Sequence, residues 1–137
     1  MTPTKYVYSI VLLSLLCFSS CSKKLRTYQP GDSIQLELEH GTLIQLGEEV
    51  VSIEFIQVVE DSRCPEGMQC IWAGRFIAEL RINQKNLYHV GLFNHSPADP
   101  DAIAFIPYKN YKISILATRS RGKMKPVRYL ILQVENV

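Results

Sequence analysis

Residues 75–92, RFIAELRINQKNLYHVGL, decide the fold class of this chain. Apolar residues share one parity and charged residues occupy the other, which is the period of two expected for a strand with one buried face. The apolar set is Phe76, Ala78, Leu80 and Ile82, and the charged set is Arg75, Glu79 and Arg81. Residues 83–86, NQKN, are typical of a turn, and residues 87–92 return with apolar character. The segment therefore predicts a β-hairpin.

The same period of two recurs on both sides of this hairpin. It occurs at 33–39, at 112–117 and, with less regularity, at 127–134. In residues 51–59 the alternation shifts register at Ile56, Val58 and Val59, as a β-bulge would cause. No sustained 3.6-residue period occurs after the first twenty residues. These patterns predict an all-β domain, an antiparallel β-sandwich of about seven to nine strands, with a small β-barrel as the alternative.

Composition limits the chain to one globular domain. It has 137 residues, of which 47% are hydrophobic and 20% charged, and its net charge is +2. This balance is typical of a folded protein and argues against a disordered chain. The small net charge argues against nucleic acid as a partner.

The first twenty residues resemble an export signal. Lys5 is followed by an uncharged run from Tyr6 to Phe18. A helix over this run would rise roughly 20 Å, too short to cross a membrane but typical of the apolar region of a signal peptide. We therefore expect residues 1–20 to form a signal-peptide helix.

The end of this segment indicates lipidation. Ser19 and Ser20 precede Cys21, which resembles the lipobox of bacterial lipoproteins with Cys21 as the lipidated residue. Acyl chains on Cys21 would hold the protein stably at a membrane. The polar residues 21–31 would then be a lipidated tether, and residues 32–137 the all-β domain. We expect a bacterial cell-envelope protein anchored by lipid, with the choice of membrane left open.

The chain has four cysteines. Cys17 lies within the expected signal peptide and Cys21 is the lipidation candidate, so Cys64 and Cys70 are the two left to form a disulfide. They lie in the seven-residue stretch CPEGMQC, whose Pro65 and Gly67 favour a turn. In an oxidising compartment two cysteines this close predict a disulfide. Five intervening residues do not match the usual spacing of zinc ligands, so we expect no metal or other cofactor.

Residues 60–74, EDSRCPEGMQCIWAG, contain the most specific motif of the chain. The pattern D-S-R-C-P, then four residues, C, one residue and W-A-G resembles the hallmark of an uncharacterised family of small bacterial secreted proteins and lipoproteins. The resemblance covers about fifteen residues and implies export and a strand-rich domain. It implies no activity.

Two hypotheses explain this motif. In the first it is a structural corner, in which Trp72 packs on the core and Asp61 pairs with Arg63. In the second the clamped loop is a candidate interaction loop that presents Asp61, Arg63 and Trp72 to a partner. A less favoured version of the second is a protease inhibitor that offers Arg63 to a trypsin-like pocket.

Charge is distributed unevenly along the chain. Nine acidic residues and one basic residue lie in 32–66, whereas seven basic and no acidic residues lie in 109–128. Residues 118–126 resemble the tip of the last hairpin and carry a candidate basic surface of Arg119, Arg121, Lys123 and Lys125. This surface would suit an anionic membrane or glycan. Alternatively, the acidic and basic segments complement each other across the sandwich, or are simply solvated.

No catalytic motif is present. His40, His89 and His95 form no metalloprotease pattern, and no nucleophile elbow or phosphate-binding glycine loop occurs. We therefore predict no catalytic residues and no enzyme, and regard an unrecognised hydrolase as the less favoured outcome.

These observations predict a binding or interaction module. The first hypothesis is a protein-interaction module at the membrane that uses the 61–74 loop or the basic hairpin tip, with an envelope protein as partner. The alternative is a glycan or small-ligand domain that uses aromatic platforms, with Trp72, Tyr88, Tyr108, Tyr111 and Tyr129 as candidates. The sequence leaves the oligomeric state open.

Overall fold

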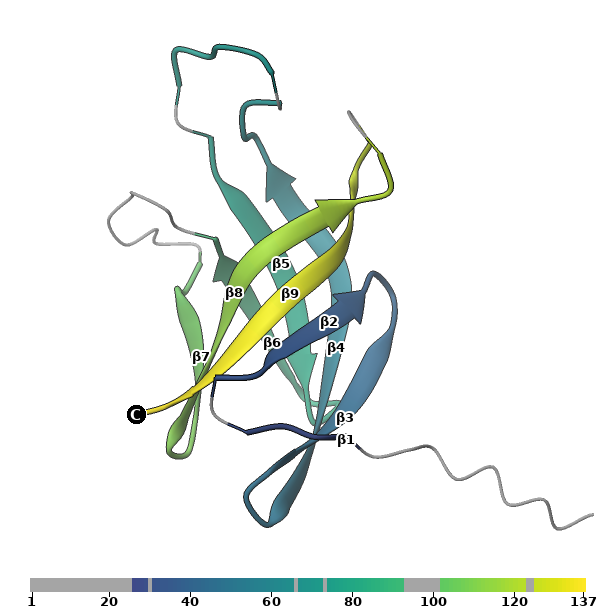
Figure 1. The fold of residues 1–137 in the computed structure, drawn as a ribbon, viewed down its shortest axis with the longest axis vertical. Helices are drawn as coiled ribbons and strands as arrows, with labels where there is room; N and C mark the ends of the chain where they lie inside the picture. Colours follow the sequence, from purple (N-terminus) through teal and green to yellow (C-terminus); the bar gives the residue numbers. More distant parts are fainter. Residues whose placement is uncertain (1–25, 30, 66, 73, 93–101, 123–124) are drawn as a thin grey trace, which may run out of the picture.

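The computed structural model describes residues 26–29, 31–65, 67–72, 74–92, 102–122 and 125–137. The predicted signal peptide, the lipidation candidate Cys21, Lys123 and His95 lie outside the described residues. Within them the chain is all-β (Figure 1). The strands are β1 (Arg26–Thr27), β2 (Ser33–Glu37), β3 (Gly41–Leu46), β4 (Glu49–Asp61), β5 (Phe76–Ile82), β6 (Asn86–Gly91), β7 (Phe105–Tyr108), β8 (Tyr111–Ser120) and β9 (Val127–Asn136).

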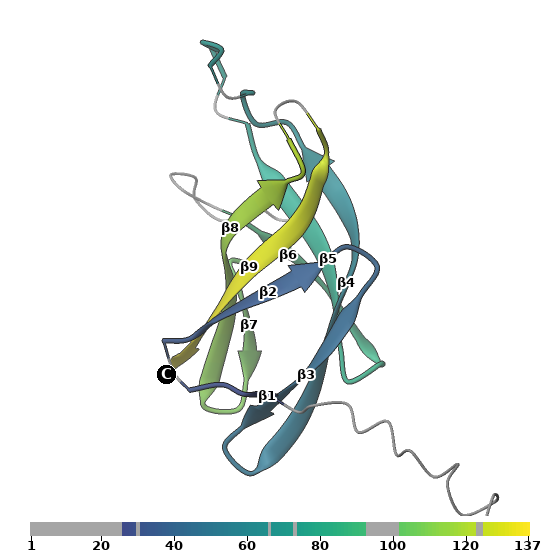
Figure 2. The ribbon, with the colours of Figure 1, turned by 45° about the vertical axis from the view of Figure 1, so that its right-hand side comes forward.

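The strands form two sheets that pack face to face as a β-sandwich, which confirms the predicted fold class. One sheet has the order β1-β3-β4-β5-β6 and the other has the order β2-β9-β8-β7. All neighbouring strands are antiparallel except for the two-residue β1, which pairs with β3 in parallel. Figure 2 shows the same two sheets after a 45° turn about the vertical axis.

The predicted hairpin over 75–92 is present as β5 and β6, paired from Ile82 with Asn86 to Ile77 with Gly91. Asn83 and Gln84 both adopt positive φ, and the Lys85 N–H donates to the Ile82 carbonyl over 3.2 Å. These are features of a type I′ turn, whose twist suits a two-stranded hairpin.

The predicted register shift in β4 is also confirmed. The pairing of β4 with β5 slips between Phe55 and Gln57 and again between Val58 and Glu60. Each slip bends the strand and increases its twist. Strand β4 spans 13 residues and, with β5, carries the connecting loop beyond the end of the sandwich (Figure 1).

Part of the stretch expected to be a tether belongs to the sheet. Arg26 and Thr27 pair with Ile44 and Gln45 of β3, and the Gly31 N–H donates to the Val134 carbonyl over 2.8 Å. The domain therefore includes residues before Asp32. Two backbone pairs are too few to leave a readable alternation in the sequence.

The core fills the space between the two sheets with aliphatic and aromatic side chains. Its buried cluster extends from Ile34 to Val134 in the chain and includes Phe55 and Phe76, which are fully buried. No buried polar or charged side chain occurs among the described residues.

Candidate interaction site at the disulfide loop

The loop between β4 and β5, residues 62–75, projects from one end of the sandwich (Figures 1 and 2). Cys64 and Cys70 are joined by a disulfide, as predicted, with their Cα atoms 5.8 Å apart. Gly67 lies in the ring at φ +83°, and the Met68 N–H donates to the Pro65 carbonyl over 3.1 Å. The turn chemistry of the ring therefore closes the loop over a short span.

Two hydrogen bonds between Ser62 and Arg75 close the base of this loop. The Ser62 N–H donates to the Arg75 carbonyl over 3.0 Å, and the Arg75 N–H donates to Ser62 Oγ over 3.1 Å. Between them the chain passes so closely that a Cβ on Gly74 would lie 1.9 Å from the Ser62 carbonyl oxygen. Only glycine fits at this crossing.

Arg63 ties the loop base to the opposite sheet. Its Nε and Nη2 donate to the two carboxylate oxygens of Asp61 over 2.7 and 2.8 Å, which forms the expected fork. Its Nη1 donates to Thr118 Oγ1 of β8 over 2.8 Å, and its guanidinium lies 4.6 Å from the centroid of the Phe76 ring. One side chain thus links β4, β5 and β8.

The expectation that Trp72 packs on the core is wrong. Its indole N–H donates to the Ser62 carbonyl over 3.1 Å, yet the residue is 58% exposed. Trp72 shares parity with Phe76 in the sequence, but β5 begins only at Phe76, so the parity does not carry over to Trp72. The loop also stands beyond the sandwich, where no core is available to cover the ring.

Three large apolar side chains are exposed on this loop. Met68 is 60% exposed and Ile71 is fully exposed, and both accompany Trp72. We call these three residues the apolar tip. Met68 and Ile71 were not among the residues predicted from the sequence to bind a partner. Both lie within two residues of Cys70 in a segment without strand alternation, and the lack of alternation is a signal for exposure.

The β8–β9 hairpin ends beside this loop. Its described cations, Arg119, Arg121 and Lys125, are exposed, and we call them the basic hairpin tip. Arg121 Nη2 lies 3.3 Å from the Tyr129 hydroxyl and 3.4 Å from a carboxylate oxygen of Glu37.

Glu37 of β2 forms ion pairs with Arg121 and Arg128 of this hairpin. Arg128 Nε donates to its carboxylate over 2.9 Å, and this hydrogen bond is the main reason that the pKa of Glu37 is lowered. Arg121 adds a smaller contribution of the same sign. The acidic and basic segments of the sequence therefore meet here within one sheet.

The described histidines lie apart from this site. His40 Nδ1 is 2.9 Å from the Leu38 carbonyl, and His89 Nε2 is 3.1 Å from a Glu79 carboxylate oxygen. No three of the His, Cys, Asp and Glu side chains in the described ranges are grouped closely enough to hold a metal ion. Those ranges likewise contain no helix of the length and apolarity needed to cross a membrane.

The candidate tyrosines do not gather as an exposed platform. Tyr88, Tyr108 and Tyr111 are half-buried and pack against the core cluster. The Tyr108 hydroxyl donates to Glu49 over 3.1 Å, and the Tyr129 hydroxyl contacts Arg121. The hydroxyls of Tyr108 and Tyr129 are therefore already engaged within the domain.

Together the fold and this end of the molecule define an all-β domain of the sandwich class with one disulfide-clipped, projecting loop. Comparison with known proteins returned no matching family model, no similar curated protein and no similar solved structure.

Proposed function

We propose that this protein is a lipid-anchored interaction module of the bacterial cell envelope that presents the apolar tip to a protein partner. The observation that carries the proposal is the exposure of Met68, Ile71 and Trp72 on a loop that is otherwise firmly held. Large apolar side chains gathered at one place on a surface mark interaction sites more often than scattered ones do. Trp is also among the residues enriched at binding hot spots.

The bracing of the loop supports the same proposal. The disulfide, the Ser62–Arg75 pairing and the Arg63 fork order the loop before any partner arrives. A pre-ordered loop loses less conformational entropy when it binds, so more of the contact energy remains as affinity. A loop with no partner would not need exposed apolar residues on so rigid a support.

The proposed localisation rests on the sequence. Residues 1–20 resemble a lipoprotein signal, Cys21 is the lipidation candidate, and the motif in 60–74 resembles that of small bacterial secreted proteins and lipoproteins. Mass spectrometry of the mature N-terminus tests this part. We expect a chain that begins at acylated Cys21, and an unmodified Cys21 or another start would contradict it.

The alternatives receive less support from the geometry. A trypsin-like pocket would need Arg63 to extend into it, but its guanidinium is held by Asp61 and Thr118. A glycan platform would need accessible aromatic faces along a sheet, whereas Tyr88, Tyr108 and Tyr111 pack against the core.

Photo-crosslinking in the intact envelope tests the proposed function. The photoreactive residue p-benzoylphenylalanine replaces Ile71 in one variant and Leu87 in the other. Leu87 is a matched control because it is 57% exposed but lies on β6, away from the loop. We expect one discrete protein adduct at position 71 and none at position 87. No protein adduct at position 71, or equal adducts at both positions, would refute the proposal.

A further inference from the structure

We infer that the apolar tip and the basic hairpin tip form one composite docking surface, and that it fits a protein partner whose apolar cleft is bordered by carboxylates. This inference rests on the proposed function and specifies the chemistry of the partner. The sequence presents the two segments as separate candidates, because more than forty residues lie between Trp72 and Arg119. The fold places them at the same end of the sandwich (Figures 1 and 2).

A direct contact joins the two segments. Arg63, at the base of the loop, donates through Nη1 to Thr118 Oγ1, one residue before Arg119. Because Asp61 fixes the other side of the same guanidinium, the loop and the hairpin are held in a set relation. A partner that covers the apolar tip therefore meets the cations of the hairpin in the same approach.

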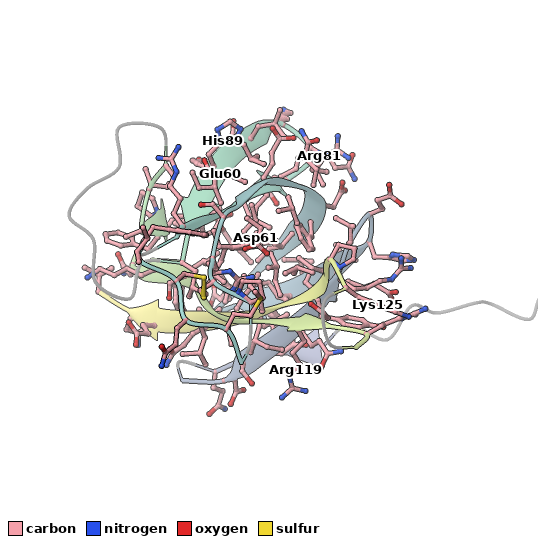
Figure 3. All side chains as sticks on the ribbon, turned by 90° about the horizontal axis from the view of Figure 1, so that it is seen from above. Glu60, Asp61, Arg81, His89, Arg119 and Lys125 are labelled. Atoms are coloured by element: carbon pink, nitrogen blue, oxygen red, sulfur yellow. A yellow bond between two sulfur atoms is a disulfide. The ribbon has the colours of Figure 1, made fainter. Side chains whose placement is uncertain are left out.

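Among the described residues, the net charge of this end is positive once the ion pairs within it are counted. Asp61 is matched by Arg63 over 2.7 Å, and Glu60 is matched by Arg75 over 2.7 Å. Arg119 and Lys125 are exposed and form no ion pair within the described part of the chain. In Figure 3, which looks down on this end, Arg119 and Lys125 lie across Asp61 from Glu60 and His89.

This arrangement favours an acidic partner. Cations beside an apolar centre raise the rate of association with a negatively charged surface and fix its orientation. The three apolar side chains supply the desolvated centre, and Arg119 and Lys125 supply the charged rim. The complementary surface is therefore an apolar cleft with carboxylates on one side.

The path of the chain favours a protein over the anchoring membrane. Arg26 pairs with Ile44 in the half of the domain opposite the projecting loop (Figure 1). Since the proposed lipid anchor at Cys21 lies only five residues before Arg26, the chain reaches the membrane from that opposite half. The composite surface then faces away from the anchoring membrane, toward molecules in the surrounding envelope.

The experiment repeats the position-71 crosslink in a variant that carries Arg119→Gln and Lys125→Gln. The matched control is Lys85→Gln, which removes an exposed cation from the β5–β6 turn. The partner identified from the adduct is then purified without the crosslink. The Kd of its complex with the unmodified chain, and with each variant, is measured at two salt concentrations. We expect the double variant to bind about five- to thirty-fold more weakly, with a smaller salt dependence, and Lys85→Gln to bind normally.

The outcomes separate the two proposals. If the protein adduct at position 71 still forms in the Arg119→Gln, Lys125→Gln variant and the affinity is unchanged, the composite surface and its acidic partner are overturned. The proposed interaction module is then retained. Absence of any protein adduct at position 71 overturns both. Binding to vesicles of 70% phosphatidylcholine and 30% phosphatidylglycerol is followed by the fluorescence of Trp72, the only tryptophan of the sequence. If the chain binds these vesicles and no protein adduct forms, the surface binds lipid and not a protein. Thermal unfolding of each variant checks that its fold is intact.

Discussion

At the scale of single residues, the motif in 60–74 separates into residues that brace the loop and residues that the loop exposes. Ser62, Arg63 and Gly74 are fully explained by contacts within the domain. The side chains of Met68 and Ile71 are largely exposed to solvent. Trp72 belongs to both groups, because its indole N–H is bonded inward while its ring is exposed. The structural and functional hypotheses for the motif are therefore compatible.

Gly74→Ala tests the crossing at the loop base. The added Cβ would lie 1.9 Å from the Ser62 carbonyl oxygen and 2.3 Å from its carbonyl carbon, so the backbone must move. We expect a loss of about 1–3 kcal/mol in the free energy of unfolding, measured by urea denaturation. Gly122→Ala is the control, since its Cβ would meet only the flexible Lys125 side chain at 3.7 Å. Equal effects of the two substitutions would contradict the crossing.

Arg63→Met tests the link between the loop and β8. The change keeps an apolar stem but removes the fork to Asp61 and the bond to Thr118. Because the Arg63 side chain is still about one-third exposed, we expect a loss of only about 1–2 kcal/mol in the free energy of unfolding. Arg63→Lys should restore little of it, because an ammonium cannot bind Asp61 through two parallel bonds. Full rescue by lysine would show that charge alone matters here.

At the scale of elements, the β4–β5 arm is what carries the site. Its two register shifts lie in the part of β4 that pairs with β5, and the pairing of Asp61 with Phe76 brings the loop ends together at the end of the sandwich. The disulfide then acts only within the loop, on residues 64–70. The pairing of β4 with β5 therefore sets the position of the loop, whereas the disulfide constrains only the ring within it.

The double variant Cys64→Ser and Cys70→Ser tests this division. Opening a seven-residue ring should lower the free energy of unfolding by about 2 kcal/mol while the domain still folds. Hydrogen exchange gives the sharper readout. We expect the Met68 amide, bonded to Pro65 in the ring, to exchange faster, and the Ser62 amide, bonded to Arg75, to stay protected. Loss of protection at Ser62 in the folded variant would show that the disulfide also holds the base.

At the scale of the whole molecule, charge contacts connect segments that are distant in the sequence. Glu49 of β4 contacts Lys109 in the turn between β7 and β8, and it accepts from the Tyr108 hydroxyl over 3.1 Å. These contacts join one sheet to the other. Glu37 and Arg128 make a second link, between β2 and β9. The complementarity between the acidic and basic segments is thus real at these two places.

The pH dependence of stability tests the contact between the sheets. The hydrogen bond from Lys109, followed by that from Tyr108, lowers the pKa of Glu49 below its ordinary value of 4.5. The unfolded chain therefore takes up the proton first as the pH falls, so the contribution of Glu49 is complete above pH 4.5 and is lost as the pH falls through the lowered value.

Glu49→Gln should accordingly unfold at a lower temperature than the unaltered chain at pH 7, and the gap should close under acid conditions. Thermal unfolding followed by circular dichroism from pH 7 to pH 3 measures this gap. Glu48→Gln is the control, because Glu48 is exposed and forms no ion pair in the described part of the chain. A gap that does not change with pH would show that the Glu49 side chain acts by packing instead.

Much of the fold could be predicted from local pattern. The hairpin at 75–92, the register shift in β4 and the Cys64–Cys70 disulfide all depend on residues close in the sequence, and all are present. Strand β1 was not predictable, because it consists of two residues whose partner, β3, lies farther along the chain. The burial of Trp72 was predicted wrongly, because alternation says nothing about side chains outside a strand.

The sequence by itself determined the all-β class, the positions of most strands, the disulfide and the presence of a distinctive motif. These follow from side-chain period, turn chemistry and short loop closure, which act over a few residues. Only the tertiary structure decided that the loop stands clear of the core, that Arg63 reaches Thr118 across 55 positions, and that the apolar and basic tips share one end. The packing of two twisted sheets sets those relations, and no local pattern encodes which strand ends it brings together.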